Sequence, residues 1–235
     1  MPASSIREFS DTTLDPPVRG FLHAPATPNG SAVVLTHGAG ANSQAPLLRA
    51  LAEAFADAGF TILRSNLPFR QLRPFGPPRP SDATRDRAGI KNAVAAMKKL
   101  AGGPAFAVSG ARGQIFLAGH SYGGRQSSML AAEESELAAG LLLLSYPLHP
   151  PRRPEQQRTQ HLPDLGTPAL FVHGTRDPFG SIGELERALK MIPARTKLMP
   201  IEGASHDLGF KGKAGNEELP KAILSVFATF FQATS

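Results

Sequence analysis

The sequence predicts a single α/β domain over residues 1–235, with a mostly parallel central sheet of about seven or eight strands and helices on both faces. Short, continuous apolar runs alternate along the chain with longer segments whose apolar residues recur at helical spacing. This alternation is typical of a parallel sheet that is covered on both sides. A length of 235 residues suits one large α/β domain. The longest insertion, residues 147–163, is too short for a separate cap domain.

The predicted strands follow one another along the chain at regular intervals. Buried strands are expected at residues 32–36, 61–64, 115–118, 141–145 and 169–172, where apolar residues are nearly continuous. A weaker candidate at 196–201 contains Pro200, which indicates an edge strand. Ahead of these, segments 6–9 and 18–23 are separated by the turn-rich sequence D-T-T-L-D-P-P and can form an antiparallel pair.

Helices are expected between these strands. The first lies before Gly59, which ends it, and the second begins near Ser81, a candidate N-cap. Further helices are expected at 123–137, 182–191 and from about residue 219 onward. Two segments rich in proline and arginine, 68–80 and 147–163, are expected to be loops.

The composition excludes several other classes of protein. Apolar residues make up 41% of the chain, which rules out disorder of the whole chain. There is no cysteine, so disulfides, zinc–thiolate sites and a cysteine nucleophile are excluded. The net charge is +6, but no helix interleaves basic residues with aromatics, so we expect no nucleic-acid partner. No signal peptide or membrane span is predicted, and we expect a cytoplasmic protein without a membrane partner.

A sharp turn follows the strand predicted at 115–118. Residues 119–123 read G-H-S-Y-G and lead into a helix. Glycine is required on both sides of the serine, because side chains there would strike the neighbouring strand and helix. Such a turn exposes Ser121, which is therefore the candidate nucleophile. The alternative is a glycine-rich turn whose serine caps the helix.

A serine nucleophile needs a base and a carboxylate that orients the base. His206 lies in a loop just past the last predicted strand, where it can reach over the sheet as the base. Asp177 follows the strand at 169–172 and is the expected acid, so that the chain order is Ser, Asp, His. Asp207 adjoins His206, and adjacent side chains rarely form such a bond. The alternative for Asp177 is a turn-forming aspartate before proline.

Two backbone N–H groups are also needed to bind the oxyanion of an acyl-transfer intermediate. Tyr122 follows the nucleophile and can supply one. Ala39, in the small-residue turn after the strand at 32–36, can supply the other. As a phosphate-binding loop this turn lacks both the second half of a G-x-G-x-x-G and the lysine of a P-loop. The predicted chemistry requires no metal and no cofactor.

The remaining histidines and several arginines are assigned by position. We expect His37, His120 and His173 to pack beneath the site, and His23, His149 and His161 to be solvated. Six arginines can form a cationic rim that binds a substrate carboxylate or phosphate: Arg64, Arg70, Arg73, Arg125, Arg152 and Arg153. The alternative is that these charges are solvated, with Arg64 and Arg125 hydrogen-bonded to loop carbonyls.

The motifs G-H-S-Y-G-G-R, H-G-T-R-D-P-F-G and G-A-S-H-D-L together resemble the α/β-hydrolase superfamily, over nearly the whole chain. Within it, the chain resembles small hydrolases related to dienelactone hydrolase. The sequence R-S-N-L-P-F at residues 64–69 fits the branch shared with testis-expressed and NSL-complex-subunit proteins. The resemblance implies Ser121 as nucleophile, Asp177 as acid and His206 as base. The cysteine nucleophile of dienelactone hydrolases is absent, so their specific chemistry is not carried over.

These features predict a serine hydrolase that cleaves a small-molecule carboxylic ester or thioester through an acyl-enzyme. An acyltransferase or a peptidase would use the same three residues, because pocket shape selects the acceptor. The non-enzymatic alternative is a scaffold or complex subunit, since some eukaryotic relatives in the resembled branch act as subunits.

Overall fold

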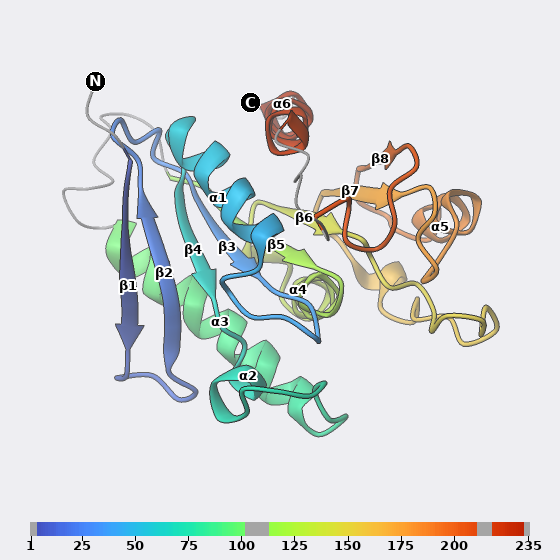
Figure 1. Ribbon diagram of the computed structural model, residues 1–235, viewed down its shortest axis with the longest axis horizontal. Coiled ribbons are helices and arrows are strands. Elements are labelled where there is room, and N and C mark those ends of the chain that lie inside the picture. The colour runs from blue at the N-terminus through green and yellow to red at the C-terminus, as the bar shows by residue number, and fades with distance from the viewer. Residues whose placement is uncertain (1–3, 102–112, 211–217, 233–235) are drawn as a thin grey trace.

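An eight-stranded sheet runs through the part of the chain that the structure describes, in the order β1-β2-β4-β3-β5-β6-β7-β8. The computed structural model describes residues 4–101, 113–210 and 218–232 (Figure 1). The strands are β1 (Ser5–Asp11), β2 (Val18–Ala24), β3 (Ala32–Thr36), β4 (Thr61–Ser65), β5 (Ile115–His120), β6 (Gly140–Leu144), β7 (Ala169–Gly174) and β8 (Thr196–Ile201). All the strands expected from the sequence are present, and the predicted fold class is confirmed.

Strand direction follows the predicted pattern. β1 pairs with β2 and β2 with β4 in antiparallel fashion, whereas the six strands from β4 to β8 in the sheet order are parallel. β8 is an edge strand, which accommodates Pro200 because an edge leaves one side of the strand without a ladder partner. The carboxyl ends of six parallel strands therefore meet along one edge of the sheet, where a site is expected.

Helices cover both faces of this sheet (Figure 1). On one face α1 (Pro46–Asp57) and α6 (Glu218–Gln232) pack against side chains such as Val33 and Leu35. On the other face α3 (Asp82–Ala101), α4 (Tyr122–Glu133) and α5 (Ile182–Leu189) share a core with Val34. Successive side chains of a strand point to opposite faces, so continuously apolar strands are what a sheet buried on both sides needs.

Two segments expected to be loops contain short helices. α2 (Pro68–Leu72) begins with proline at its first turn, where the missing N–H costs no helical hydrogen bond. A single 3₁₀ turn (Leu162–Asp164) lies in the second segment. The described residues form no separate cap over the carboxyl edge of the sheet. Among them, no helix has both the length and the apolar character needed to cross a membrane.

An aromatic cluster beneath α6 generates a prediction about stability. Phe227 is 1% exposed, and its ring centroid lies 5.1 Å from that of Phe55, 4.9 Å from Phe116 and 4.6 Å from Phe231. Phe227→Ala should lower the free energy of unfolding by about 3–5 kcal/mol, because it leaves a cavity among these rings. Phe75→Ala is the matched control, since Phe75 is 84% exposed. Equal urea midpoints for the two variants would contradict this packing.

Candidate active site

Ser121 stands at the turn between β5 and α4 in a strained backbone conformation. Its φ is 52° and its ψ is −114°, a combination that residues with a side chain seldom adopt. Hydrogen bonds hold the residue on both sides: its N–H donates to Leu144 O at 2.8 Å, and Arg125 N–H donates to Ser121 O at 2.9 Å. The turn therefore fixes the serine at the carboxyl edge of the sheet.

The glycines around Ser121 allow three backbone segments to touch. A Cβ added to Gly119 would lie 2.4 Å from Gly124 N, and one added to Gly123 would lie 2.5 Å from Thr36 Oγ1. Both distances are well below van der Waals contact, as the sequence motif predicted. Gly124, which the sequence analysis did not single out, is equally constrained, because its added Cβ would lie 2.6 Å from Gly119 O. The sequence G-G after the tyrosine was the available signal.

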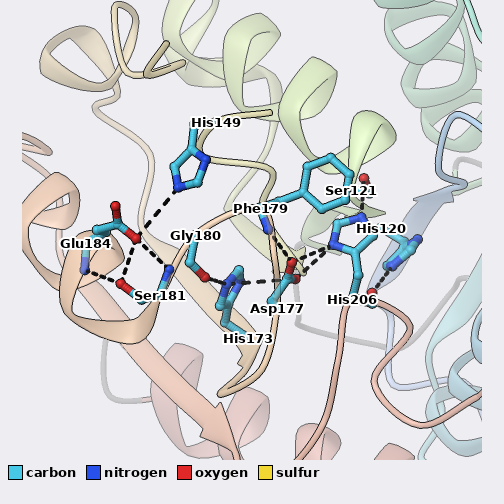
Figure 2. Close-up of polar contacts among 10 residues, drawn as sticks. All are labelled: His120, Ser121, His149, His173, Asp177, Phe179, Gly180, Ser181, Glu184 and His206. Atoms are coloured by element: carbon cyan, nitrogen blue, oxygen red, sulfur yellow. Dashed lines mark hydrogen bonds and ion pairs between the residues drawn. The ribbon is translucent and has the colours of Figure 1, made fainter. Parts of the chain in front are cut away.

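The structure brings the three predicted triad residues into one hydrogen-bonded chain (Figure 2). His206 Nε2 lies 2.8 Å from Ser121 Oγ. His206 Nδ1 lies 2.8 Å and 3.0 Å from the two carboxylate oxygens of Asp177. With Nδ1–H donated to the carboxylate, Nε2 is left as the acceptor for the serine hydroxyl.

Asp177 reaches the histidine from the loop that follows β7. Its side chain is fully buried, and Oδ1 also accepts the Phe179 N–H at 2.9 Å. Asp207, the neighbour of His206, instead accepts the N–H of Gly209 at 3.2 Å within its own turn. The aspartate that contacts the imidazole is thus the one predicted from strand order.

Two further residues, whose roles the sequence analysis did not identify, hold His206 in place (Figure 2). His120 Nε2–H donates to the backbone oxygen of His206 at 2.8 Å. The Phe179 ring lies against the imidazole, with a centroid separation of 4.2 Å and an interplanar angle of 31°. The motif D-P-F-G already placed an aromatic residue two positions after the acid, but sequence alone did not indicate its partner.

Of the three histidines expected beneath the site, His173 is fully buried with Nε2 2.8 Å from Gly180 O, and the other two are neutral because of their surroundings. Burial lowers the pKa of His37 and of His120 to about 4. His37 Nδ1–H donates to Gly38 O at 2.9 Å, while its Nε2 accepts the Leu67 N–H at 3.1 Å. These buried rings connect backbone segments, as the sequence analysis expected.

The two backbone segments expected to bind an oxyanion both border Ser121. Tyr122 is the first residue of α4. The turn that contains Ala39 lies against the serine, since a Cβ added to Gly38 would be 3.5 Å from Ser121 Cβ. Within the described residues, no group of three or more His, Asp or Glu side chains is arranged to hold a metal ion.

The predicted cationic rim does not include Arg64 or Arg70. For Arg64 the alternative, a hydrogen bond to a loop carbonyl, is the one observed. Arg64 is only 3% exposed, and its guanidinium donates to His23 Nε2 at 2.8 Å and to Ser43 O at 2.6 Å. Arg70 is 9% exposed and donates to backbone oxygens. Both side chains turn inward because unpaired carbonyl groups lie within reach, and a buried guanidinium must be hydrogen-bonded.

The other four arginines are distributed differently. Arg73 forms an ion pair with Asp82, Arg152 and Arg153 are exposed, and Arg125 is half-buried on α4. All three histidines expected in solvent also differ from the prediction. His23 and His149 are buried, and the half-buried His161 lies 2.8 Å from Ser128 Oγ through its Nε2. His161 is held against α4 by this contact, whereas His149 lies by the loop after β7, where its backbone N–H donates to Phe179 O at 3.0 Å.

A parallel sheet with a serine on a strand–helix turn, followed by an aspartate and a histidine after later strands, defines the α/β-hydrolase fold. The family model described as an alpha/beta hydrolase domain matches residues 29–232, and the chain belongs to this family.

Solved structures share this fold over the full length. The chain is similar to dienelactone hydrolase from Anabaena variabilis, with a TM-score of 0.71, 21% identity and 99% of each chain covered. It is similar to Est1E from Butyrivibrio proteoclasticus, with a TM-score of 0.69, 18% identity and coverage of 97% of this chain and 100% of that one. It is also similar to XC6422 from Xanthomonas campestris, an α/β serine hydrolase without a lid, with a TM-score of 0.64, 15% identity and coverage of 100% and 99%.

The buried histidines predict how stability depends on pH. Burial lowers the pKa of His23, His37, His120 and His161 from 6.5 to about 4. Between these values the unfolded chain binds protons that the folded chain does not, so stability is present above pH 6.5 and is lost as pH falls toward 4. Each such proton should contribute a slope of about 1.4 kcal/mol per pH unit in urea denaturation.

His161→Gln is the matched variant for this prediction, because glutamine can keep a hydrogen bond to Ser128. Removing one imidazole whose pKa is lowered should make the loss of stability between pH 6.5 and pH 4 shallower than in the wild type. A wild-type stability that stays constant from pH 7 to pH 4.5 would contradict the prediction.

Proposed function

We propose that this protein is a serine hydrolase that cleaves a small-molecule carboxylic ester or thioester through an acyl-enzyme. The observation that carries the proposal is that one imidazole, His206, is hydrogen-bonded at 2.8 Å both to Ser121 Oγ and to the Asp177 carboxylate. This is the geometry that turns a weak alcohol nucleophile into a reactive one. Membership of the alpha/beta hydrolase family supports a hydrolase of this kind.

In the proposed first step, Ser121 Oγ attacks the substrate carbonyl carbon while its proton passes to His206 Nε2. The carbonyl oxygen becomes an oxyanion, which the N–H groups of Ala39 and Tyr122 bind. Asp177 holds the imidazole by its Nδ1–H and stabilises the imidazolium that forms. Collapse of the intermediate breaks the bond to the alcohol or thiol, which leaves with the proton held by His206.

In the second step, water attacks the acyl carbon and gives its proton to His206 Nε2. The second tetrahedral intermediate then collapses, the carboxylic acid is released, and Ser121 Oγ recovers its proton. The strained turn supports this role. It places Ser121 ahead of the first residue of α4, where the serine oxygen is held at the edge of the sheet. Neither step requires a metal or an organic cofactor.

We expect the loops at the carboxyl edge of the sheet to determine which substrate is bound. With no cap among the described residues, we expect the segment 68–80, which includes α2, and the segment 147–163 to limit substrate size. The same three residues would serve an acyltransferase or a peptidase, and assays with alcohol, amine and peptide acceptors separate these from hydrolysis. We also propose that the chain is related to the testis-expressed and NSL-complex-subunit branch, which the motif at residues 64–69 resembles.

Ser121→Ala should abolish ester and thioester turnover and leave the fold intact, because it removes one oxygen atom. We expect a loss of about 10⁴-fold or more in kcat. The measurement is a panel of esters and thioesters of graded acyl length, assayed with wild type and variant. Retention of more than a tenth of the wild-type rate would rule out Ser121 as the nucleophile.

Asp177→Asn should lower kcat by about 10²- to 10⁴-fold with little effect on folding, because an amide favours the wrong imidazole tautomer. Asp207→Asn is the matched control, since an amide oxygen can still accept the Gly209 N–H, and its rate should stay close to the wild-type value. If the control lost more activity than Asp177→Asn, the acid would have to be reassigned to Asp207.

A further inference from the structure

The guanidinium of Arg70 binds the turn that contains Ala39. Arg70 lies on the short helix α2, and its Nε donates to Ala41 O at 2.8 Å. One Nη2 donates both to Ala39 O at 2.8 Å and to Gly76 O at 2.9 Å, and Nη1 donates to Arg73 O at 3.1 Å. Four carbonyl oxygens from two loops are therefore held by one planar side chain.

The charge of Arg70 is compensated by these carbonyl dipoles. The side chain is 9% exposed, and within the described ranges no carboxylate forms an ion pair with it. The Phe69 ring, 4.9 Å from the guanidinium carbon, adds a cation–π contact. Burying a cation costs free energy unless the cation is well hydrogen-bonded. The hydrogen bonds of Arg70 to this turn offset that cost and at the same time fix the turn. Four of the five N–H groups of Arg70 are already bound to carbonyl oxygens, so the bidentate geometry that arginine uses to bind an anion is not free.

The conformation of the turn determines what this contact does. Ala41 N–H donates to Gly38 O at 3.1 Å, which closes a four-residue turn with Ala39 and Gly40 at its centre. Gly40 is not in the left-handed region, so the turn is of type I, with Ala39 in a helical conformation. The N–H and the C=O of such a residue point in opposite directions. Because Arg70 donates to the Ala39 oxygen from one side, the Ala39 N–H points away from Arg70.

The same short helix also fixes the neighbourhood of Tyr122. Asp86, which is fully buried, accepts the Phe69 N–H at 2.9 Å and the Tyr122 hydroxyl at 2.7 Å. The Phe69 and Tyr122 rings meet edge to face at a centroid distance of 5.7 Å. α2 thus joins the two backbone segments proposed to bind the oxyanion, one through Arg70 and the other through Phe69.

We propose that Arg70 is a positioning residue that holds the Ala39 N–H in place to bind the oxyanion. This inference rests on the proposed hydrolase function. It replaces the expectation that Arg70 binds an anionic substrate group, and it makes a different kinetic prediction. A lost positioning contact weakens binding of the transition state for every substrate, whereas a lost substrate contact raises KM for anionic substrates alone.

The test uses Arg70→Lys and Arg70→Met, assayed with an anionic ester and its neutral isostere. Loss of one oxyanion donor lowers kcat by about 10²- to 10³-fold. A donor that is present but misplaced should lower kcat by at least about tenfold and by no more than loss of the donor does. We expect this fall for both esters and both variants, with KM unchanged within about threefold, because lysine cannot span four carbonyls. Affinity for a boronic acid that mimics the tetrahedral intermediate should fall by the same factor as kcat/KM.

Arg85→Gln is the matched control, because Arg85 is an exposed arginine that pairs with Asp15 and contacts no part of the turn. It should keep wild-type kcat and KM. Thermal unfolding checks that each variant is folded. If Arg70→Met does not fold, the kinetic test is made with Arg70→Lys. A kcat for folded Arg70→Lys within twofold of wild type would overturn the inference, as would a rise in KM confined to the anionic ester. If wild type turns over neither ester and forms no adduct at Ser121, the proposed function itself fails.

Discussion

The close approach of three backbone segments around Ser121 is the constraint on which the rest of the site depends. β5, α4 and the end of β3 touch at Gly119 and Gly123, where an added Cβ would lie 2.4–2.5 Å from a neighbouring atom. This contact forces Ser121 into a φ of 52° and brings the Ala39 turn against it. Catalytic geometry here is thus a consequence of backbone packing, which a side-chain substitution at either glycine would disrupt.

Buried polar side chains, two of them neutral histidines and one a charged arginine, give the site further support. His120 holds the backbone of His206, His37 joins the Ala39 turn to the start of α2, and Arg70 grips that turn from outside. Each makes its contacts to backbone atoms of loops. Loops carry little apolar surface of their own, so such hydrogen bonds are what give a loop-borne site its rigidity.

The sequence allowed the sheet and the triad to be predicted for physical reasons. Continuous apolar strands have no other favourable environment than a sheet buried on both faces, and the carboxyl ends of its parallel strands must meet at one edge. That reasoning placed Ser121, Asp177 and His206 together. It left two alternatives open for Arg64, of which the hydrogen bond to a loop carbonyl is the one observed, and it failed for Arg70, whose position near the same edge suggested a rim. Which way a long side chain turns depends on carbonyl groups from distant segments, such as Ser43 and Ala39, and spacing does not reveal them.

The central claim is that Ser121 is activated by His206 and Asp177, and labelling by a fluorophosphonate tests it most directly. The probe phosphonylates an activated serine and not a merely exposed one. The account predicts one adduct per folded chain, located at Ser121 by peptide mass spectrometry, and loss of labelling in His206→Ala and in denatured protein. An adduct at another residue, or no adduct on folded wild-type protein, would contradict it.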